Sequence, residues 1–221
     1  MSIRRDAVSA TRISYDRVAA AYAAHVADEL AGKPMDRALI GVLLELTHPG
    51  IVADIGCGPG HVMAELAARA APGTRVIGLD LSPAMCGLAG CATSLPVCAA
   101  DMTCLPLGSG SLTGLLSWYA VIHLDDDQRA AAYREFHRVL GPGGHALIAF
   151  HTRDQDIAPG GHRTMGQWFD RDVELTFRFL NPAVEADALA WAGFTVVARL
   201  DRQHHPGTEY PSDRTYLLVR H

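Results

Sequence analysis

The sequence predicts an α/β fold: a doubly wound sheet of seven strands that is mostly parallel and has an antiparallel strand near the C-terminus. Short apolar runs alternate with helical patterns across residues 50–150, which is typical of a parallel sheet with helices on both faces. Two further apolar runs, 194–200 and 215–219, have too little chain between them for a crossover helix, so we expect this pair to be antiparallel. The 221 residues suit one domain.

The N-terminal part is predicted to be helical. Residues 7–30 place alanines and larger apolar side chains at helical spacing, which predicts a helix or a helix pair. The run Gly32-Lys33-Pro34 ends this segment, and residues 35–46 predict a second helix with its apolar residues on one face. We expect residues 1–48 to form a helical lid.

The strands are predicted from the remaining apolar runs. They lie at 51–55, 75–80, 95–100, 112–118, 145–150, 194–200 and 215–219. Helices are predicted at 62–70, from Ser82-Pro83 onward, at 126–140 and from 182 to 192, and the Asp125-Asp126-Asp127 run suits a helix N-terminus.

Composition and charge exclude several classes of protein. The net charge of −5 comes without a basic stripe, so no nucleic-acid partner is expected. No apolar run approaches the ~20 residues of a membrane span, and the N-terminus lacks a signal-peptide pattern. The five cysteines form no Cys-x-x-Cys pair, which predicts free thiols, a cytoplasmic location and no metal site.

A glycine-rich loop follows the first predicted strand, with the sequence Asp54-Ile55-Gly56-Cys57-Gly58-Pro59-Gly60. Such a loop presents backbone N–H groups at a helix N-terminus and lets a ligand approach the backbone closely. Asp80 ends the second strand and is placed to accept both hydroxyls of a ribose, while Asp101 can accept from an adenine amine. Leu81, Met85 and Met102 offer apolar surface for the adenine ring.

The spacing of the glycines is Gly-x-Gly-x-Gly. A nicotinamide-binding loop has Gly-x-Gly-x-x-Gly, and here the last position is His61. Residues 52–60 resemble motif I of the class I S-adenosylmethionine-dependent methyltransferases, and residues 76–85, 100–107 and 133–144 are similar to later motifs of that family. The likeness is greatest to its small-molecule branch, which includes the ubiquinone/menaquinone-type enzymes.

The resemblance implies a Rossmann-like domain that binds S-adenosyl-L-methionine and releases S-adenosyl-L-homocysteine. It implies that Gly56 and Gly58 pack under the methionine portion, that Asp54 orients the loop and the cofactor amine, and that a tyrosine of the N-terminal helix covers the cofactor. The expected cofactor-binding residues are Tyr15, Tyr22, Asp54, Gly56, Cys57, Gly58, Gly60, Asp80, Leu81, Met85, Asp101, Met102, Ser117 and Trp118. We divide the single domain into the lid, a cofactor-binding core at 50–150, a substrate-side insertion at 151–182 and a C-terminal helix with strands at 183–221.

Methyl transfer to an O, N or C nucleophile of a small molecule is an in-line displacement, in which positioning supplies much of the rate and some acceptors need a base. His123, after the fourth strand, is our first candidate base, and His151, at the end of the fifth, is the second; either residue also suits packing. The segment 151–172 is expected to be a loop that shapes the acceptor pocket, with Met165, Trp168 and Phe169 as candidate lining residues.

Two other functions fit the sequence. One is an NAD-dependent oxidoreductase, against which the glycine spacing and the antiparallel strand count. The other is a non-catalytic binding partner with the same fold, because methyl transfer leaves no obligatory catalytic motif. The sequence favours no particular acceptor and no particular oligomeric state.

Overall fold

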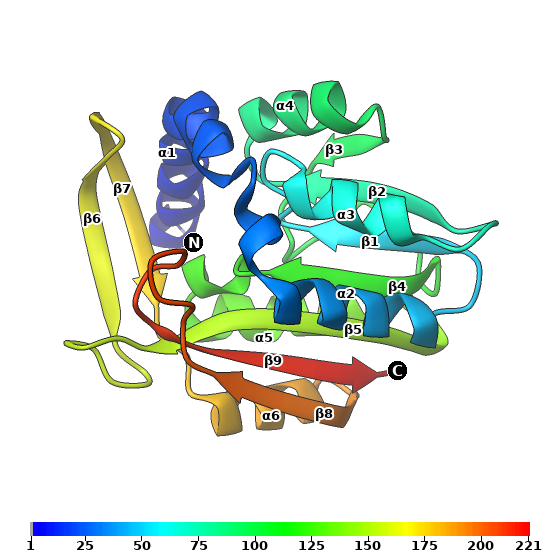
Figure 1. The fold of residues 1–221 in the computed structure, drawn as a ribbon. Coiled ribbons are helices and arrows are strands. Elements are labelled where there is room, and N and C mark those ends of the chain that lie inside the picture. The colour runs from blue at the N-terminus through cyan, green and yellow to red at the C-terminus, as the bar shows by residue number, and fades with distance from the viewer. Residues whose placement is uncertain (1) are drawn as a thin grey trace.

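The computed structural model describes the backbone of residues 2–221 and the side chains from residue 8 onward. Its main sheet has seven strands: β1 (Ile51–Ile55), β2 (Arg75–Asp80), β3 (Val97–Ala99), β4 (Leu112–Trp118), β5 (Leu140–Arg153), β8 (Thr195–Arg202) and β9 (Asp213–Arg220). They lie in the order β3-β2-β1-β4-β5-β9-β8 (Figure 1). Only β9 runs against its neighbours in this sheet, pairing antiparallel with both β5 and β8. The predicted fold class is confirmed.

Helices cover both faces of the sheet. They are α1 (Ser2–Val26), α2 (Pro34–Leu46), α3 (His61–Arg69), α4 (Pro83–Thr93), α5 (Asp126–Val139) and α6 (Pro182–Trp191), with short 3₁₀ turns η1 (Glu29–Gly32) and η2 (Val121–His123). Apolar residues of α5 and α6 pack on one face, and those of α2, α3 and α4 on the other. Successive strand residues such as Leu115 and Leu116 belong to opposite faces, which explains why these strands are apolar without alternation.

The helix starts follow from local hydrogen bonding. The Ser82 hydroxyl accepts from the backbone N–H of Met85 at 3.1 Å and caps α4. Asp125 caps α5 in a reciprocal pair with Gln128, in which each side chain accepts from the other residue's backbone N–H at 2.8 Å. The acidic run at 125–127 therefore begins a helix, as its sequence predicts. No helix among residues 2–221 is both long and apolar enough to span a membrane.

A two-stranded hairpin stands apart from the main sheet and corrects one prediction. It consists of β6 (His162–Trp168) and β7 (Arg171–Arg178), so the segment expected to be a loop contains a strand. Its two-residue turn is Phe169-Asp170, both in the left-handed region with φ of 48° and 56°. Such turns usually carry Asn-Gly, and a Phe-Asp turn gives no comparable sequence pattern.

The helix α1 and the hairpin β6–β7 lie together at the carboxyl ends of the parallel strands (Figure 1). They share a small apolar cluster in which Val18, Val173 and Leu175 are buried. The Ser14 hydroxyl also accepts from the backbone N–H of Glu174 at 2.8 Å. We call α1 and β6–β7 the cover. Of the expected lid at 1–48, only α1 belongs to the cover, because α2 packs on the sheet beside α3; the hairpin was not expected in the cover.

Candidate active site

Two cavities lie between the cover and the carboxyl ends of the strands. The first has a volume of about 190 Å³ and reaches Asp80, Asp101 and the start of α5. The second has a volume of about 410 Å³ and extends from the glycine loop to the β8–β9 connection. The residues that line both cavities are Tyr15, Tyr22, Gly56, Gly58, Trp118, Tyr119 and His123. We call this shared region the junction.

The glycine loop forms one side of the junction. Gly56 has a φ of 80°, and a Cβ atom there would lie 2.3 Å from the Cβ atom of Ala120, so only glycine fits. Gly58 has a φ of 53° and donates its backbone N–H to Asp80 at 2.8 Å. Gly60 lines neither cavity: a Cβ atom there would lie 3.0 Å from the Cα atom of Ala89. The lack of a side chain at Gly60 allows α3 to approach α4 closely, and the assignment of Gly60 to the cofactor stays a prediction.

Most of the predicted adenosine-binding residues meet in the first cavity. The two carboxylate oxygens of Asp80 accept from the backbone N–H groups of Gly58 and Ser82, both at 2.8 Å, and burial raises the pKa of Asp80. One Asp101 oxygen accepts from the backbone N–H and the hydroxyl of Thr103 at 2.8 Å. The cavity wall also contains Leu81, Met85 and Met102.

Asp54 is the next-to-last residue of β1 and lines the second cavity. The residue is 1% exposed, and neither carboxylate oxygen has a hydrogen-bond partner among the described residues. Burial, and then the charge of Asp80, raise the pKa of Asp54 to about 8. Trp118 at the junction has an indole N–H that is likewise buried without a partner in the described part of the chain. Cys57 lines the second cavity, whereas the buried Ser117 lines neither cavity, so the assignment of Ser117 to the cofactor stays a prediction.

His123 connects the cover to the sheet. Its Nδ1 donates to the carbonyl of Thr176 on β7 at 3.0 Å, so its Nε2 accepts from the Tyr15 hydroxyl of α1 at 2.7 Å. Burial lowers the pKa of His123 to about 4. Because both ring nitrogens are engaged within the protein, the geometry disfavours His123 as a base for the acceptor.

His151 lies in the wall of the second cavity. Its Nδ1 is 2.8 Å from the hydroxyl of Ser212, and its ring stacks on Tyr119 with the ring centres 4.7 Å apart. Burial lowers the pKa of His151 to about 3, assisted by the charges of Arg214 and Lys33. Tyr119 has a φ of 52°, a strained conformation for an aromatic residue, and such strain is concentrated at functional sites.

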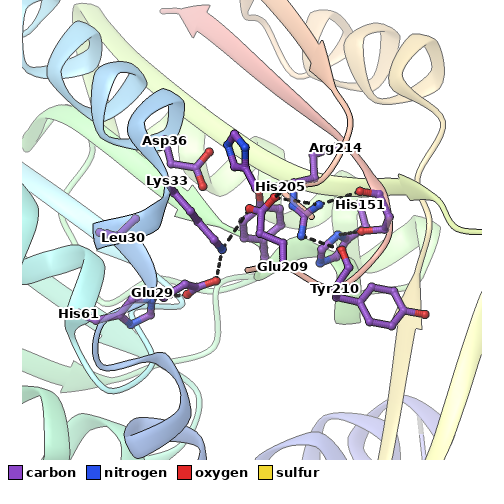
Figure 2. A network of polar contacts seen from close by, with 12 residues as sticks. Glu29, Leu30, Lys33, Asp36, His61, His151, His205, Glu209, Tyr210 and Arg214 are labelled. Atoms are coloured by element: carbon purple, nitrogen blue, oxygen red, sulfur yellow. Dashed lines mark hydrogen bonds and ion pairs between the residues drawn. The ribbon is translucent and has the colours of Figure 1, made fainter. Parts of the chain in front are cut away.

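A buried network of charges borders the second cavity (Figure 2). Lys33 forms ion pairs with Glu29 and, at 3.2 Å, with Glu209; its side chain is 3% exposed and that of Glu209 is 0% exposed. Glu209 also pairs with Arg202 at 2.7 Å and with Arg214 at 3.4 Å. The network could not be predicted from the sequence, because its members come from η1, the residue before α2, β8, β9 and the β8–β9 connection, and only the tertiary fold brings them together.

The cover supplies the apolar wall of the second cavity. Met165 and Trp168 line it, as expected for the acceptor pocket, together with Phe177 and Phe179. Phe169 does not line it and instead stacks on Trp168, with ring centres 4.9 Å apart. Within residues 2–221, no group of three or more His, Cys, Asp or Glu side chains is arranged to hold a metal ion.

Comparison with known proteins supports the sequence resemblance. Residues 52–144 match the family model described as a methyltransferase domain. A malonyl-[acyl-carrier protein] O-methyltransferase of Methylovorus sp. is 34% identical over 195 residues, which cover 83% of this chain and 62% of that protein. An uncharacterized 37.1 kDa transposon protein of Streptomyces fradiae is 37% identical over 128 residues, covering 55% of this chain and 36% of that protein. The chain thus spans less than two thirds of these curated relatives.

Solved structures share the architecture. The 1,6-didemethyltoxoflavin-N1-methyltransferase of Burkholderia thailandensis superimposes with a TM-score of 0.71 at 22% identity, covering 98% of this chain and 89% of that one. None of the proteins named here is a ubiquinone/menaquinone-type enzyme, so that branch stays a prediction. The chain therefore has the fold of the S-adenosylmethionine-dependent methyltransferases, and its residues 52–144 match their methyltransferase domain.

Proposed function

We propose that this protein is an S-adenosylmethionine-dependent methyltransferase that acts on an O, N or C nucleophile of a small molecule. The observation that carries the proposal is the convergence of Asp54, Asp80 and Asp101 on two connected cavities beneath one glycine loop. The match of residues 52–144 to a methyltransferase domain supports it. The O-methyltransferase of Methylovorus makes oxygen the first nucleophile to test.

The residues present fit the cofactor. The first cavity offers Asp80 to the ribose hydroxyls and Asp101 to the adenine amine, with Met102 as an apolar contact. The unpartnered carboxyl of Asp54 suits the cationic amine of the methionine portion, since a buried carboxylate is stabilised by an opposite charge. When bound, the cofactor supplies a methyl group activated by a sulfonium. Tyr15, Tyr22 and Trp118 surround the junction with aromatic rings, which attract such a cation.

The second cavity is proposed to hold the acceptor. Its position beside the junction suits in-line approach, and the cover supplies its apolar wall. For an acceptor that must lose a proton, His151 is a better candidate than His123, because the Nε2 of His151 makes no hydrogen bond within the described residues. We retain the division into lid 1–48, core 50–150, insertion 151–182 and C-terminal part 183–221 as part of this proposal.

Calorimetric titration with S-adenosylhomocysteine and with NADH tests the cofactor. Binding of S-adenosylhomocysteine at micromolar concentration, without binding of NADH, is the expected result; the reverse would identify an oxidoreductase. Methyl transfer is then assayed with a labelled donor across oxygen, nitrogen and carbon acceptors. Cofactor binding without transfer to any acceptor would favour a non-catalytic binding partner.

A further inference from the structure

On the acceptor side of the second cavity, three strands meet and contribute one polar wall that contains a single cation among the described residues, Arg214. Tyr119 follows β4, His151 lies near the end of β5, and Arg214 lies at the beginning of β9. Because β9 is antiparallel, its beginning reaches the edge at which the parallel strands end. His151 and Arg214 are direct cross-strand partners, and all three residues line the second cavity.

Arg214 is a buried cation, and one of its N–H donors makes no hydrogen bond among the described residues. Its side chain is 3% exposed. Its two terminal nitrogens donate to the backbone carbonyls of Ser212, at 2.7 Å, and Tyr210, at 3.2 Å, and the guanidinium carbon lies 5.9 Å from the centre of the Tyr119 ring. Its Nε–H is buried and has no hydrogen-bond partner among the described residues. Leaving a donor of a charged group unpaired is costly, which makes this N–H a natural contact for a ligand oxygen.

Arg214 shares its carboxylate partner with two other buried cations. Glu209 pairs with Lys33, Arg202 and Arg214, and Arg202 also pairs with Asp36 at 2.7 Å. The other acid that pairs with Lys33 is Glu29, which also bonds His61 at 3.0 Å on the side away from Arg214 (Figure 2). The opposite wall is apolar, with Met165, Trp168 and Phe177 among its residues. The cavity therefore combines an apolar surface with a buried, partly unpaired cation.

We propose that Arg214 and His151 form an oxyanion-selective acceptor subsite, so that the methyl acceptor is an apolar small molecule carrying a carboxylate or an ionised acidic hydroxyl. Arg214 donates its Nε–H to the oxyanion, and His151, with its Nδ1 accepting from the Ser212 hydroxyl, donates through Nε2. This inference rests on the proposed methyltransferase function. An acceptor that arrives as an oxyanion has no proton to lose: its lone pair forms the C–O bond, the C–S electron pair remains on sulfur, and both formal charges disappear.

Matched pairs of ligands test the subsite. Protein saturated with S-adenosylhomocysteine is titrated calorimetrically with cinnamate and cinnamamide, and with 4-nitrophenolate and 4-nitroanisole. We expect at least one anion to bind tenfold or more tightly than its neutral counterpart, and the pair that responds distinguishes carboxylate from phenolate acceptors. Neutral members that bind as well as the anions, or a complete lack of anion binding, would overturn the proposal.

Substitutions test whether Arg214 is the residue responsible for the preference for anions over neutral ligands. Arg214→Gln is expected to reduce the anion preference to less than threefold, whereas Arg153→Gln, an exposed arginine on β5 outside the cavities, is expected to retain it. An Arg214→Gln protein that binds S-adenosylhomocysteine normally and keeps its tenfold preference contradicts the assignment. If that variant does not fold, Arg214→Lys decides: it keeps the charge without the Nε–H, and an undiminished preference rejects the subsite.

The two hypotheses fail in different ways. Wild-type protein that binds no S-adenosylhomocysteine contradicts the proposed function itself. Wild-type protein that binds it and shows no preference for anions contradicts only the oxyanion subsite.

Discussion

Asp80 joins the glycine loop to the start of α4, because its two oxygens accept from Gly58 and Ser82. Asp80→Ala removes both of these bonds and the proposed ribose contact. We expect the affinity for S-adenosylhomocysteine to fall at least tenfold, as measured by calorimetry. Asp187→Ala, an exposed aspartate on α6, is the matched control and should bind normally. Unchanged affinity in Asp80→Ala would remove Asp80 from the cofactor site.

Asp54 makes the stability of the ligand-free protein depend on pH. Its folded-state pKa of about 8 is higher than its ordinary value of 3.8, so between these values the folded protein holds a proton that the unfolded chain has released. Its contribution to the free energy of unfolding is therefore full below about pH 4 and is lost as the pH rises towards 8. Asp54→Asn should abolish this loss.

The comparison is made by urea unfolding of both proteins at about pH 5 and pH 8, which lie within that window. We expect the stability advantage of Asp54→Asn over wild type to increase by about 2–4 kcal/mol across it. His123 and His151, whose pKa values are lowered by burial, are present in both proteins, so their effects cancel in the difference. A constant difference would mean that Asp54 is ionised throughout.

Some residues of the candidate site could be predicted from the sequence, and others could be found only in the folded structure. Asp80 and Asp101 could be predicted because each follows a strand of a parallel sheet, and the carboxyl ends of such strands meet at one edge. The engagement of His123 by Tyr15 and Thr176 could not, because these partners come from α1 and β7, which are brought to it only by folding. Arg214 was missed for the same reason, since nothing in its local sequence distinguishes it from other arginines.

Among the elements, the cover depends on the contact between α1 and η2. Tyr15→Phe removes the hydroxyl that bonds His123 and leaves a buried Nε2 without its partner. We expect a loss of about 1–2 kcal/mol in the free energy of unfolding and faster amide hydrogen exchange in α1 and β7.

Tyr22→Phe is the matched control for the stability of the cover. Tyr22 lies on the same helix and makes no hydrogen bond through its hydroxyl among the described residues, so its variant should unfold like wild type. If hydrogen exchange in α1 and β7 were equally fast in both variants, the Tyr15–His123 bond would not be what holds the cover.

Most elements of the main sheet were predictable because strands such as β1, β4 and β9 are largely buried, and because α4, α5 and α6 each begin at a side-chain cap. The hairpin β6–β7 could not be predicted as a hairpin in the same way. The residues of β6 alternate in burial only weakly, and the turn at Phe169-Asp170 uses left-handed geometry without glycine or asparagine. Its stability comes from packing against α1, which is more than 130 residues away in the chain.

For the molecule as a whole, a ligand that fills both cavities should tie the cover to the sheet. At a concentration of S-adenosylhomocysteine a hundred times its Kd, we expect a gain of about 2.7 kcal/mol in the free energy of unfolding. Hydrogen exchange should slow in α1, the glycine loop and β6–β7, and stay unchanged in α6 and β8, which line neither cavity. Equal slowing throughout the chain would mean that the ligand stabilises only against global unfolding.

The antiparallel direction of β9 bears on how the sequence of this protein can diverge. Because of this direction, Arg214 and the β8–β9 connection lie at the cavity, although they come from outside residues 52–144. The same is true of α1 and the hairpin. Under the proposed function, most of the wall that would select the acceptor is thus encoded outside the stretch that carries the glycine loop, Asp80 and Asp101. Exchange of the flanking stretches between related proteins would then alter acceptor choice while the glycine loop and these two aspartates are kept.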